Sequence, residues 1–308
     1  MADTDFELIS RAGESLPSPA RSEDPTLPVI RVAAVQCEWD ADPATHSRTL
    51  EDGVALAAAQ GAEVVCLQEL TMSPYFAVRD DVEGALDRFG EDLESGPTVE
   101  FSRRMANSYG LAVHASLYER DGEARGFNTA ICVDVDGKLL ARTRKVHIPR
   151  FPGYHEDHYF EPGDSGFPVV EVGPAKFGFP TCWDQWFPEL ARIYSLEGAE
   201  ILVYPTTIGS EPTLEDMDSQ PFWEQMITAN GLANATFMVA VNRIGLEDPL
   251  EFFGSSFISD PYGRVIVRAP RDRRAVLVAD LDLNHRQDWL SFGLIETREP
   301  TQYGRLTE

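Results

Sequence analysis

Lysine is scarce in this chain: Lys138, Lys145 and Lys176 are the only three among 308 residues, and every other basic residue is an arginine. Acidic residues outnumber basic ones by 51 to 26, which gives a formal net charge of −25. Such a surface repels phosphate backbones and anionic headgroups, so we expect neither a nucleic acid nor a membrane as partner. A lysine in this composition is a candidate for a position that needs a compact ammonium.

Cysteine is also rare, and no two of the four cysteines form a CxxC pair. Cys37, Cys66 and Cys132 lie inside apolar segments, whereas Cys182 follows one. This distribution indicates neither a disulfide framework nor a thiolate zinc site. Apolar runs are short: none approaches the roughly 20 residues of a membrane-spanning helix. We expect a cytoplasmic protein whose residues 1–28, acidic and without the apolar core of a secretory signal, form a flexible extension.

From residue 29 onward, apolar segments alternate with helical patterns, which is typical of α/β proteins with sheets buried on both faces. The expected strands are 29–37, 63–68, 111–118, 127–135, 138–145, 236–242, 252–258, 265–267 and 275–281, and the expected helices are 42–60, 98–109, 187–192 and 222–235. Gly61-Ala-Glu63 and its echo Gly198-Ala-Glu200 each end a helix and precede a strand. The rhythm therefore occurs twice, and we expect residues 29–308 to form one domain with two similar layers.

Residues 146–166 show no periodic pattern and are rich in proline, glycine and histidine. A loop of this length in a compact domain is usually functional or covers a site.

The most informative motif is Gly178–Glu189 (GFPTCWDQWFPE), in which Cys182 stands between an apolar strand and a helical segment. A cysteine at such a junction is held by the strand, and its thiolate feels the positive end of the following helix. A peptide N–H can also face an oxyanion formed there. The alternative is a buried, inert cysteine at the end of a core strand.

Cleavage of an amide-like carbon–nitrogen bond by a thiol needs a base, an oxyanion-stabilising group and the nucleophile. One candidate for each stands at the end of a strand-like segment: Glu69 after 64–68, Lys145 after 139–144, and Cys182 after 177–181. Taken alone, Glu69 also fits a surface carboxylate at a strand end or a helix cap.

These motifs resemble those of the nitrilase superfamily, the carbon–nitrogen hydrolases, over nearly everything from residue 30 onward. The segments Leu67–Leu70 (LQEL), Arg144–Pro149 (RKVHIP) and Cys182–Glu189 occur in the order of the family's glutamate, lysine and cysteine motifs. The resemblance implies that Glu69 is the general base, Lys145 the oxyanion stabiliser and Cys182 the nucleophile, and that Glu156 orients the substrate. It also implies a four-layer α-β-β-α sandwich, with two mixed sheets flanked by helices, that assembles as a homodimer.

Within the family, two sets of sequence segments favour different substrates. Tyr204–Pro212 and Asn242–Gly245 resemble amidases that act on N-carbamoylputrescine, whereas Tyr159–Pro168 and Arg298–Gly304 resemble N-carbamoyl-amino-acid hydrolases, a group that includes β-ureidopropionases. We favour an N-carbamoyl amine, hydrolysed to the free amine, carbon dioxide and ammonia in polyamine biosynthesis. Candidate residues for binding or positioning it are Tyr75, His155, Glu156, Trp183, Asp184, Trp186, Ile208 and Glu211. A cationic tail would need carboxylates such as Glu211, Glu215 and Asp216, and a carboxylate tail would need Arg150, His155 or His158.

Two other interpretations stay open. His147, His155 and His158 could hold a metal in a rival hydrolase, but HxxH lacks the HExxH spacing of a zinc helix, so we expect the histidines to shape the pocket and no metal or cofactor. Alternatively, the chain could be an inactive interaction module of the same fold. The three intact candidates argue against that, and a lowered pKa of the Cys182 thiol would distinguish an enzyme from a scaffold.

Overall fold

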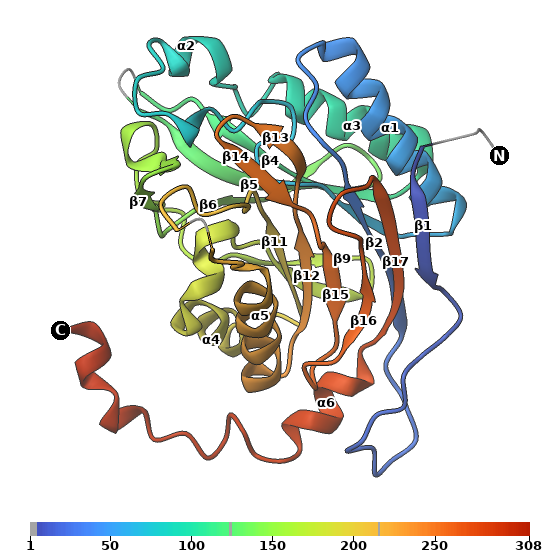
Figure 1. The fold of residues 1–308 in the computed structure, drawn as a ribbon. Helices are drawn as coiled ribbons and strands as arrows, with labels where there is room; N and C mark the ends of the chain where they lie inside the picture. Colours follow the sequence, from blue (N-terminus) through green and yellow to red (C-terminus); the bar gives the residue numbers. More distant parts are fainter. Residues whose placement is uncertain (1–4, 123–124, 215) are drawn as a thin grey trace.

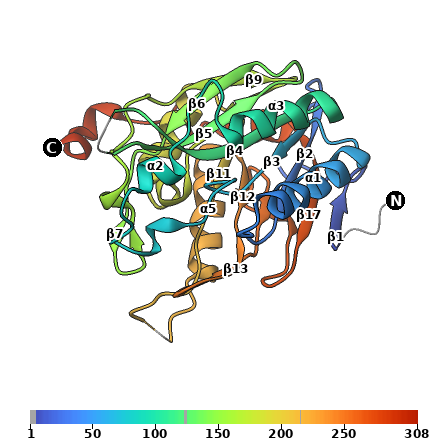
Figure 2. The same cartoon turned by 90° about the horizontal axis from the view of Figure 1, so that it is seen from above.

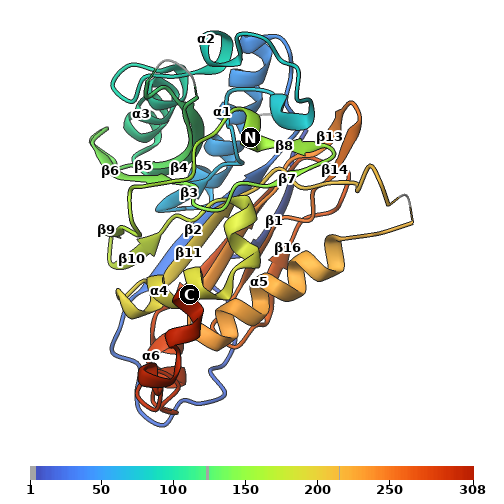
Figure 3. The same cartoon turned by 90° about the vertical axis from the view of Figure 1, so that its left-hand side faces the viewer.

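The computed structural model describes residues 5–122, 125–214 and 216–308. Two β-sheets lie face to face, and helices cover their outer faces (Figures 1 and 3). The chain therefore forms the predicted four-layer α-β-β-α sandwich.

The strands and helices of the described residues are as follows. The strands are β1 (Glu7–Arg11), β2 (Val29–Gln36), β3 (Val64–Cys66), β4 (Ala112–Glu119), β5 (Phe127–Val133), β6 (Leu139–Arg144), β7 (Arg150–Phe151), β8 (Tyr154–His155), β9 (Val169–Val172), β10 (Ala175–Gly178), β11 (Ile201–Pro205), β12 (Phe237–Val241), β13 (Ile244–Glu247), β14 (Leu250–Phe253), β15 (Phe257–Ser259), β16 (Val265–Arg268) and β17 (Ala275–Asp282). The α-helices are α1 (Pro43–Ala59), α2 (Ala85–Phe89), α3 (Pro97–Tyr109), α4 (Pro188–Leu196), α5 (Gln220–Asn234) and α6 (Asn284–Leu290). The 3₁₀ helices are η1 (Phe76–Val78), η2 (Glu156–His158), η3 (Cys182–Trp186), η4 (Pro300–Gln302) and η5 (Gly304–Thr307).

Each large sheet has three parallel strands in its interior. The seven-stranded sheet has the order β1-β17-β2-β3-β4-β5-β6, in which β2, β3 and β4 are parallel. The six-stranded sheet has the order β16-β15-β12-β11-β10-β9, in which β10, β11 and β12 are parallel. The middle strand of each trio, β3 or β11, follows Gly61 or Gly198, which confirms the repeated rhythm seen in the sequence.

The helices cover the sheets in pairs. α1 and α3 lie side by side over the seven-stranded sheet (Figure 2), and α4 and α5 pack together on the six-stranded sheet. Sequence signals at the helix ends act as expected: Asp42 Oδ2 accepts a hydrogen bond of 3.0 Å from Thr45 N at the start of α1, and Gly110 ends α3 with a φ of +66°. That left-handed φ favours glycine because it lacks a Cβ.

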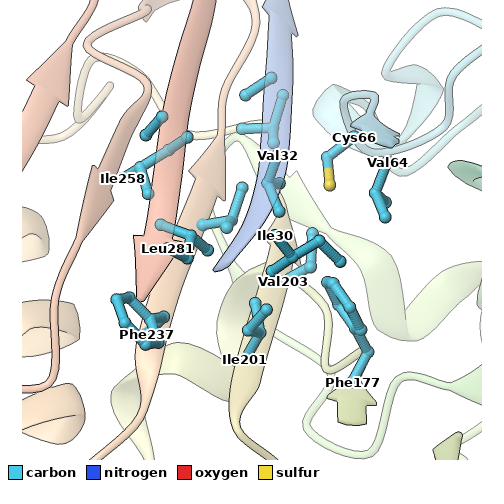
Figure 4. Packing of buried hydrophobic residues seen from close by; sticks show 14 of the residues in the cluster. Ile30, Val32, Val64, Cys66, Phe177, Ile201, Val203, Phe237, Ile258 and Leu281 are labelled. Atoms are coloured by element: carbon cyan, nitrogen blue, oxygen red, sulfur yellow. The ribbon is translucent and has the colours of Figure 1, made fainter. Parts of the chain in front are cut away.

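Apolar side chains from both sheets fill the space between them (Figure 4). Ile30, Val32 and Val64 come from one sheet, and Phe177 and Ile201 from the other, and all are fully buried. Burial of one such side chain contributes about 1.5–3 kcal/mol. The core therefore holds the ends of the central strands firmly in place.

Three sequence-based expectations need correction. Residues 7–11, assigned to a flexible extension, form β1, because their backbone pairs in parallel with β17 along the sheet edge. Residues 252–258 form two strands and not one, because Gly254 and Ser255 turn the chain with φ of +52° and +59°. The loop 146–166 contains the hairpin β7–β8 and the turn η2. The division of the chain at residue 28 stays a prediction.

Among the described residues, no helix is both long enough and apolar enough to cross a membrane. The segment after α6 runs away from the body of the molecule as an exposed arm that ends in η4 and η5 (Figure 1).

The His114 imidazole should make the fold sensitive to acid. It is fully buried in β4 and stacks on Phe179 with ring centroids 5.1 Å apart, and neither ring nitrogen has a hydrogen-bond partner among the described residues. Burial lowers the pKa of His114 to about 3. Below a pH of about 6.5, the unfolded chain therefore binds a proton that the folded chain does not, and stability falls until the pH reaches the folded pKa.

We expect this group to cost the protein about 2 kcal/mol of stability between pH 7.5 and pH 5. A His114→Phe variant keeps the stacked ring but cannot titrate, so its free energy of unfolding should fall less over that range. Urea unfolding at both pH values measures the difference. An identical fall in both proteins would contradict the role assigned to His114.

Candidate active site

The ends of three strands place the predicted triad together at one edge of the sandwich. Glu69 follows β3 of one sheet, Lys145 directly follows β6 of the same sheet, and Cys182 follows β10 of the other. All three are buried. Because side chains at the carboxyl ends of strands meet at a common edge, two packed sheets can bring them into one site.

Lys145 is the centre of this cluster. Its Nζ lies 3.0 Å from Glu69 Oε1, and 2.8 and 2.7 Å from Glu156 Oε1 and Oε2. Burial lowers the pKa of Lys145, but the anionic forms of its neighbours Cys182, Glu156 and Glu69 raise it by more and hold it above its ordinary value. The side chain is therefore an ammonium that can donate to an oxyanion.

Glu69 is held through both carboxylate oxygens. Besides Lys145, the Nδ2 of Asn128 donates to Glu69 Oε1 at 2.7 Å, and the hydroxyl of Thr207 donates to Oε2. Asn128 lies on β5, and Thr207 follows β11. Strands of both sheets thus fix the carboxylate of Glu69.

Glu156 stands on the other side of the ammonium. It belongs to η2 in the long loop, is fully buried, and accepts a hydrogen bond of 2.9 Å from the hydroxyl of Tyr75. Burial raises the pKa of Glu156 to about 7, although Lys145 acts to lower it. Near neutral pH this carboxyl can therefore hold or release a proton.

Cys182 is the first residue of η3 and has a φ of +41°, in the left-handed region that L-residues seldom adopt. Strain of this kind is common where a side chain must be presented to a substrate. Burial and the carboxylate of Glu69 raise the pKa of the thiol well above its ordinary value, while Lys145 lowers it. We expected the N-terminus of the following helix to lower the pKa of this thiol. That expectation is wrong, because η3 has only five residues and burial raises the pKa. The resting sulfur is a thiol that needs a base.

Asp184 joins the cysteine turn to the lysine loop. One carboxylate oxygen accepts hydrogen bonds of 2.9 and 2.8 Å from the backbone N and Nδ1 of His147, and the other accepts one of 3.1 Å from Thr181 N. The ring of His147 stacks on Phe187 with centroids 3.6 Å apart. Asp184 therefore fixes the loop after Lys145 against the turn that carries Cys182.

A cavity of about 400 Å³ opens beside Cys182. Trp183, Trp186 and Ile208 line it as predicted, together with Phe151 and Phe222, and its walls are mostly apolar. Among the described residues that line it, Glu211 is the only charged one. The site thus combines the Cys182 thiol with a mostly apolar cavity that holds one carboxylate, that of Glu211.

Other predicted binding residues lie elsewhere. His155 does not line this cavity and lines a different hollow together with Asp80. In the turn η2, Glu156 is the residue whose side chain is buried. Tyr75 lies behind Glu156 and contacts it. Asp216 lines a neighbouring hollow, and Glu215 is outside the described residues.

Three residues of the site, Thr207, Arg243 and Asn128, were not predicted from the sequence. Thr207 could have been found, since it follows the apolar strand β11 as Glu69 follows β3. Arg243 is fully buried, and one of its terminal nitrogens donates to the carbonyl oxygens of Glu69, Leu70 and Ser73 at 3.0, 3.0 and 3.1 Å. Nothing in its sequence spacing indicates that contact.

The other terminal nitrogen of Arg243 donates to Glu247, whose second oxygen accepts a hydrogen bond of 2.7 Å from Tyr75 N. Tyr75 in turn holds Glu156. One buried guanidinium therefore positions the backbone of Glu69 and, through Glu247 and Tyr75, the second glutamate.

Comparison with known proteins agrees with this geometry. The family model for carbon–nitrogen hydrolases matches residues 31–290. The chain belongs to the carbon–nitrogen hydrolase family. It is accordingly a hydrolase that acts on carbon–nitrogen bonds.

Two curated members of the family are similar over most of their length. Citrullinase from Francisella tularensis subsp. tularensis is 37% identical over 282 residues, which cover 90% of this chain and 98% of that protein. N-carbamoylputrescine amidase from Arabidopsis thaliana is 38% identical over 288 residues, which cover 89% of this chain and 94% of that protein.

Solved structures of the family share the fold. A carbon–nitrogen hydrolase from Helicobacter pylori G27 superposes with a TM-score of 0.82 at 29% identity, covering 91% of this chain and 99% of that one. A mutant amidase from Nesterenkonia sp. AN1, with a TM-score of 0.69 and 25% identity, covers 84% of this chain and 96% of that one and shows the result of Michael addition of acrylamide at its active-site cysteine.

Arg243 should affect turnover more than substrate binding. An Arg243→Lys variant keeps the charge, but a single ammonium cannot reach both the three carbonyls and Glu247. Because small displacements of reacting groups slow catalysis by up to roughly 10²-fold, we expect kcat to fall about 10- to 100-fold with KM changed little.

Arg286→Lys is the matched control for this measurement. Arg286 is also a buried arginine that donates to backbone carbonyls, those of Ser195, Asn234 and Ala235, away from the cluster around Lys145. The Arg286→Lys variant should be less stable than the unmodified protein, but its kcat should not fall. Equal losses of kcat in both variants would show a general effect on folding.

Proposed function

We propose that the protein is a thiol-dependent amidohydrolase that cleaves the carbamoyl carbon–nitrogen bond of an N-carbamoyl amine with a cationic tail, such as N-carbamoylputrescine. The observation that carries the proposal is the cavity at Cys182: its walls are largely apolar, and Glu211 is the one charged residue among the described residues that line it. Apolar walls suit a methylene chain, and a carboxylate suits the ammonium at the end of that chain.

In the proposed reaction, Glu69 takes the proton of the Cys182 thiol, and the sulfur attacks the ureido carbonyl carbon. Lys145 and the backbone N–H of Trp183 stabilise the oxyanion, and loss of one such donor typically costs about 10²–10³ in rate. As the intermediate collapses, the carbon–nitrogen bond breaks, and Glu69 returns the proton to the departing nitrogen.

Water then attacks the thioester carbon, Glu69 accepts a proton from it, and the sulfur leaves and is reprotonated. The carbamic acid that is released decomposes to carbon dioxide and an amine. Either order of departure of the two nitrogens gives the same products: the free amine, carbon dioxide and one ammonia. In this scheme Glu156 and Tyr75 position Lys145, and the raised pKa of the thiol is the reason that a base is required.

A substrate with a carboxylate tail fits this cavity less well. Citrulline and N-carbamoyl amino acids carry a carboxylate, which would need a cation, and the described residues that line the cavity include none. Citrulline also carries an α-ammonium that Glu211 could bind, so it is disfavoured by its carboxylate alone. Arg150 is exposed and His155 and His158 lie around η2, and none of the three lines the cavity. The relatives named N-carbamoylputrescine amidase support the amine, whereas the relative named citrullinase supports the alternative.

Three further features belong to this proposal. We infer that the protein acts in the cytoplasm, in polyamine biosynthesis, and as a homodimer. An inactive scaffold of the same fold is the contrary hypothesis, and the buried Lys145–Glu69–Glu156 cluster argues against it, since a scaffold would gain little from burying three charges.

Removal of the thiol tests the proposed nucleophile. Cys182→Ala should abolish ammonia release from N-carbamoylputrescine while calorimetry still detects binding, because the cavity walls remain. Cys132→Ala removes a buried thiol from β5 and should retain turnover. Turnover close to that of the unmodified protein in Cys182→Ala would refute the mechanism.

Glu211 tests the proposed substrate class. In Glu211→Gln, KM for N-carbamoylputrescine should rise about tenfold or more, because a charge-assisted contact contributes about 1.5–3 kcal/mol, while kcat changes little. Asp216→Asn is the matched control, since Asp216 lies outside the cavity lining. Parallel assays with citrulline and N-carbamoyl-β-alanine complete the test. Faster turnover of either acid by the unmodified protein would overturn the amine assignment.

A further inference from the structure

Three metal-ligating side chains meet on the outer side of the turn η2. Asp80, His155 and His158 each offer one ligand atom, and these atoms lie within 4.8 Å of one another. The two imidazole rings are 5.9 Å apart at an interplanar angle of 84°. Asp80 comes from the segment after η1, so two distant parts of the chain build the cluster.

The cluster faces away from the active site. Glu156, between the two histidines in sequence, is fully buried against Lys145, whereas His158 and Asp80 are exposed and His155 is half-buried. A hollow of about 380 Å³ beside the cluster is lined by Asp80 and His155 and by two more carboxylates, Asp81 and Asp248. Neither Asp80, His155 nor His158 lines the cavity at Cys182.

We propose that Asp80, His155 and His158 form a binding site for a divalent transition-metal ion of the zinc class. Two imidazoles and one carboxylate are a ligand set that such ions prefer, whereas Mg²⁺ and Ca²⁺ prefer oxygen ligands alone. Arg79 also lines the hollow and forms an ion pair of 3.0 Å with Asp81, so Asp248 and the net charge of −25 are what concentrate cations at this surface. Three protein ligands leave a fourth position for water.

The third ligand is what distinguishes this site from the HxxH pattern alone. The sequence offered His147 as the third ligand, but the ring of His147 contacts Asp184, and the fold supplies Asp80 instead, 75 residues before His155. The two segments are already joined, since the hydroxyl of Tyr159 donates to Arg79 O and accepts a hydrogen bond of 3.2 Å from Val82 N. A bound ion adds a second link and fixes the turn that carries Glu156.

The metal site lies outside the catalytic cavity, so its occupancy does not depend on the proposed substrate. The ion has a structural role: because it binds only the folded state, it raises the temperature of unfolding. Because the ion would hold η2 from outside, it stabilises the segment in which Glu156 contacts Lys145 and Tyr75.

Calorimetric titration with Zn²⁺ tests the site, on full-length protein without a histidine tag and with Cys182→Ala to remove a competing thiol. We expect one equivalent to bind and to raise the unfolding temperature. His158→Gln and Asp80→Asn should each weaken binding at least about tenfold, whereas Asp81→Asn, a neighbouring carboxylate outside the cluster, should not.

The unfolding temperature without metal shows whether each variant folds; both substituted side chains are exposed, so we expect no change. Absence of saturable Zn²⁺ binding would overturn the proposal, as would binding that survives both His158→Gln and Asp80→Asn. Mg²⁺ that binds as tightly as Zn²⁺ would overturn the assigned class of ion.

Discussion

The architecture of the site depends on one ammonium held between two buried carboxylates. Lys145 lies within hydrogen-bond distance of both Glu69 and Glu156, and none of the three side chains has access to solvent. Transfer of such charges out of water is expensive, and removal of one partner from a buried pair typically costs about 3–5 kcal/mol. The cluster therefore persists because Lys145 contacts both carboxyl groups and because Asn128, Thr207 and Tyr75 donate hydrogen bonds to them.

Two sets of hydrogen bonds fix the position of the Cys182 thiol relative to the Lys145 ammonium. Asp184 connects the turn of Cys182 to the loop after Lys145, and Arg243 connects the backbone at Glu69 to Glu247 and Tyr75. Each set joins a segment that follows a strand of one sheet to a segment that follows a strand of the other. The close packing between the sheets makes such cross-links effective, since packed interiors transmit small displacements instead of absorbing them.

The sequence predicted those features that depend on local order. Glu69, Lys145 and Cys182 each follow a segment with a strand-like pattern, and that position, together with the family motifs, identified them from the sequence. Features that arise from folding could not be predicted in this way. Arg243 binds carbonyls 170 to 174 residues away, and Asp80 lies close to two histidines of another loop. His155 was assigned to the substrate pocket as a histidine of the long loop, but in the turn η2 it is Glu156 that is buried, and His155 faces a different hollow.

The central claim is that the charge of Lys145 acts on the sulfur of Cys182, and the pH dependence of alkylation tests it most directly. Iodoacetamide is uncharged, and mass spectrometry can follow its reaction at each of the four cysteines. We predict that Cys182 reacts first, because it lines a cavity while Cys37, Cys66 and Cys132 are fully buried. In a folded Lys145→Met variant the alkylation of Cys182 should slow and require higher pH, because the cation that lowers the thiol pKa is gone. An unchanged pH profile of Cys182 alkylation in that variant would contradict the account.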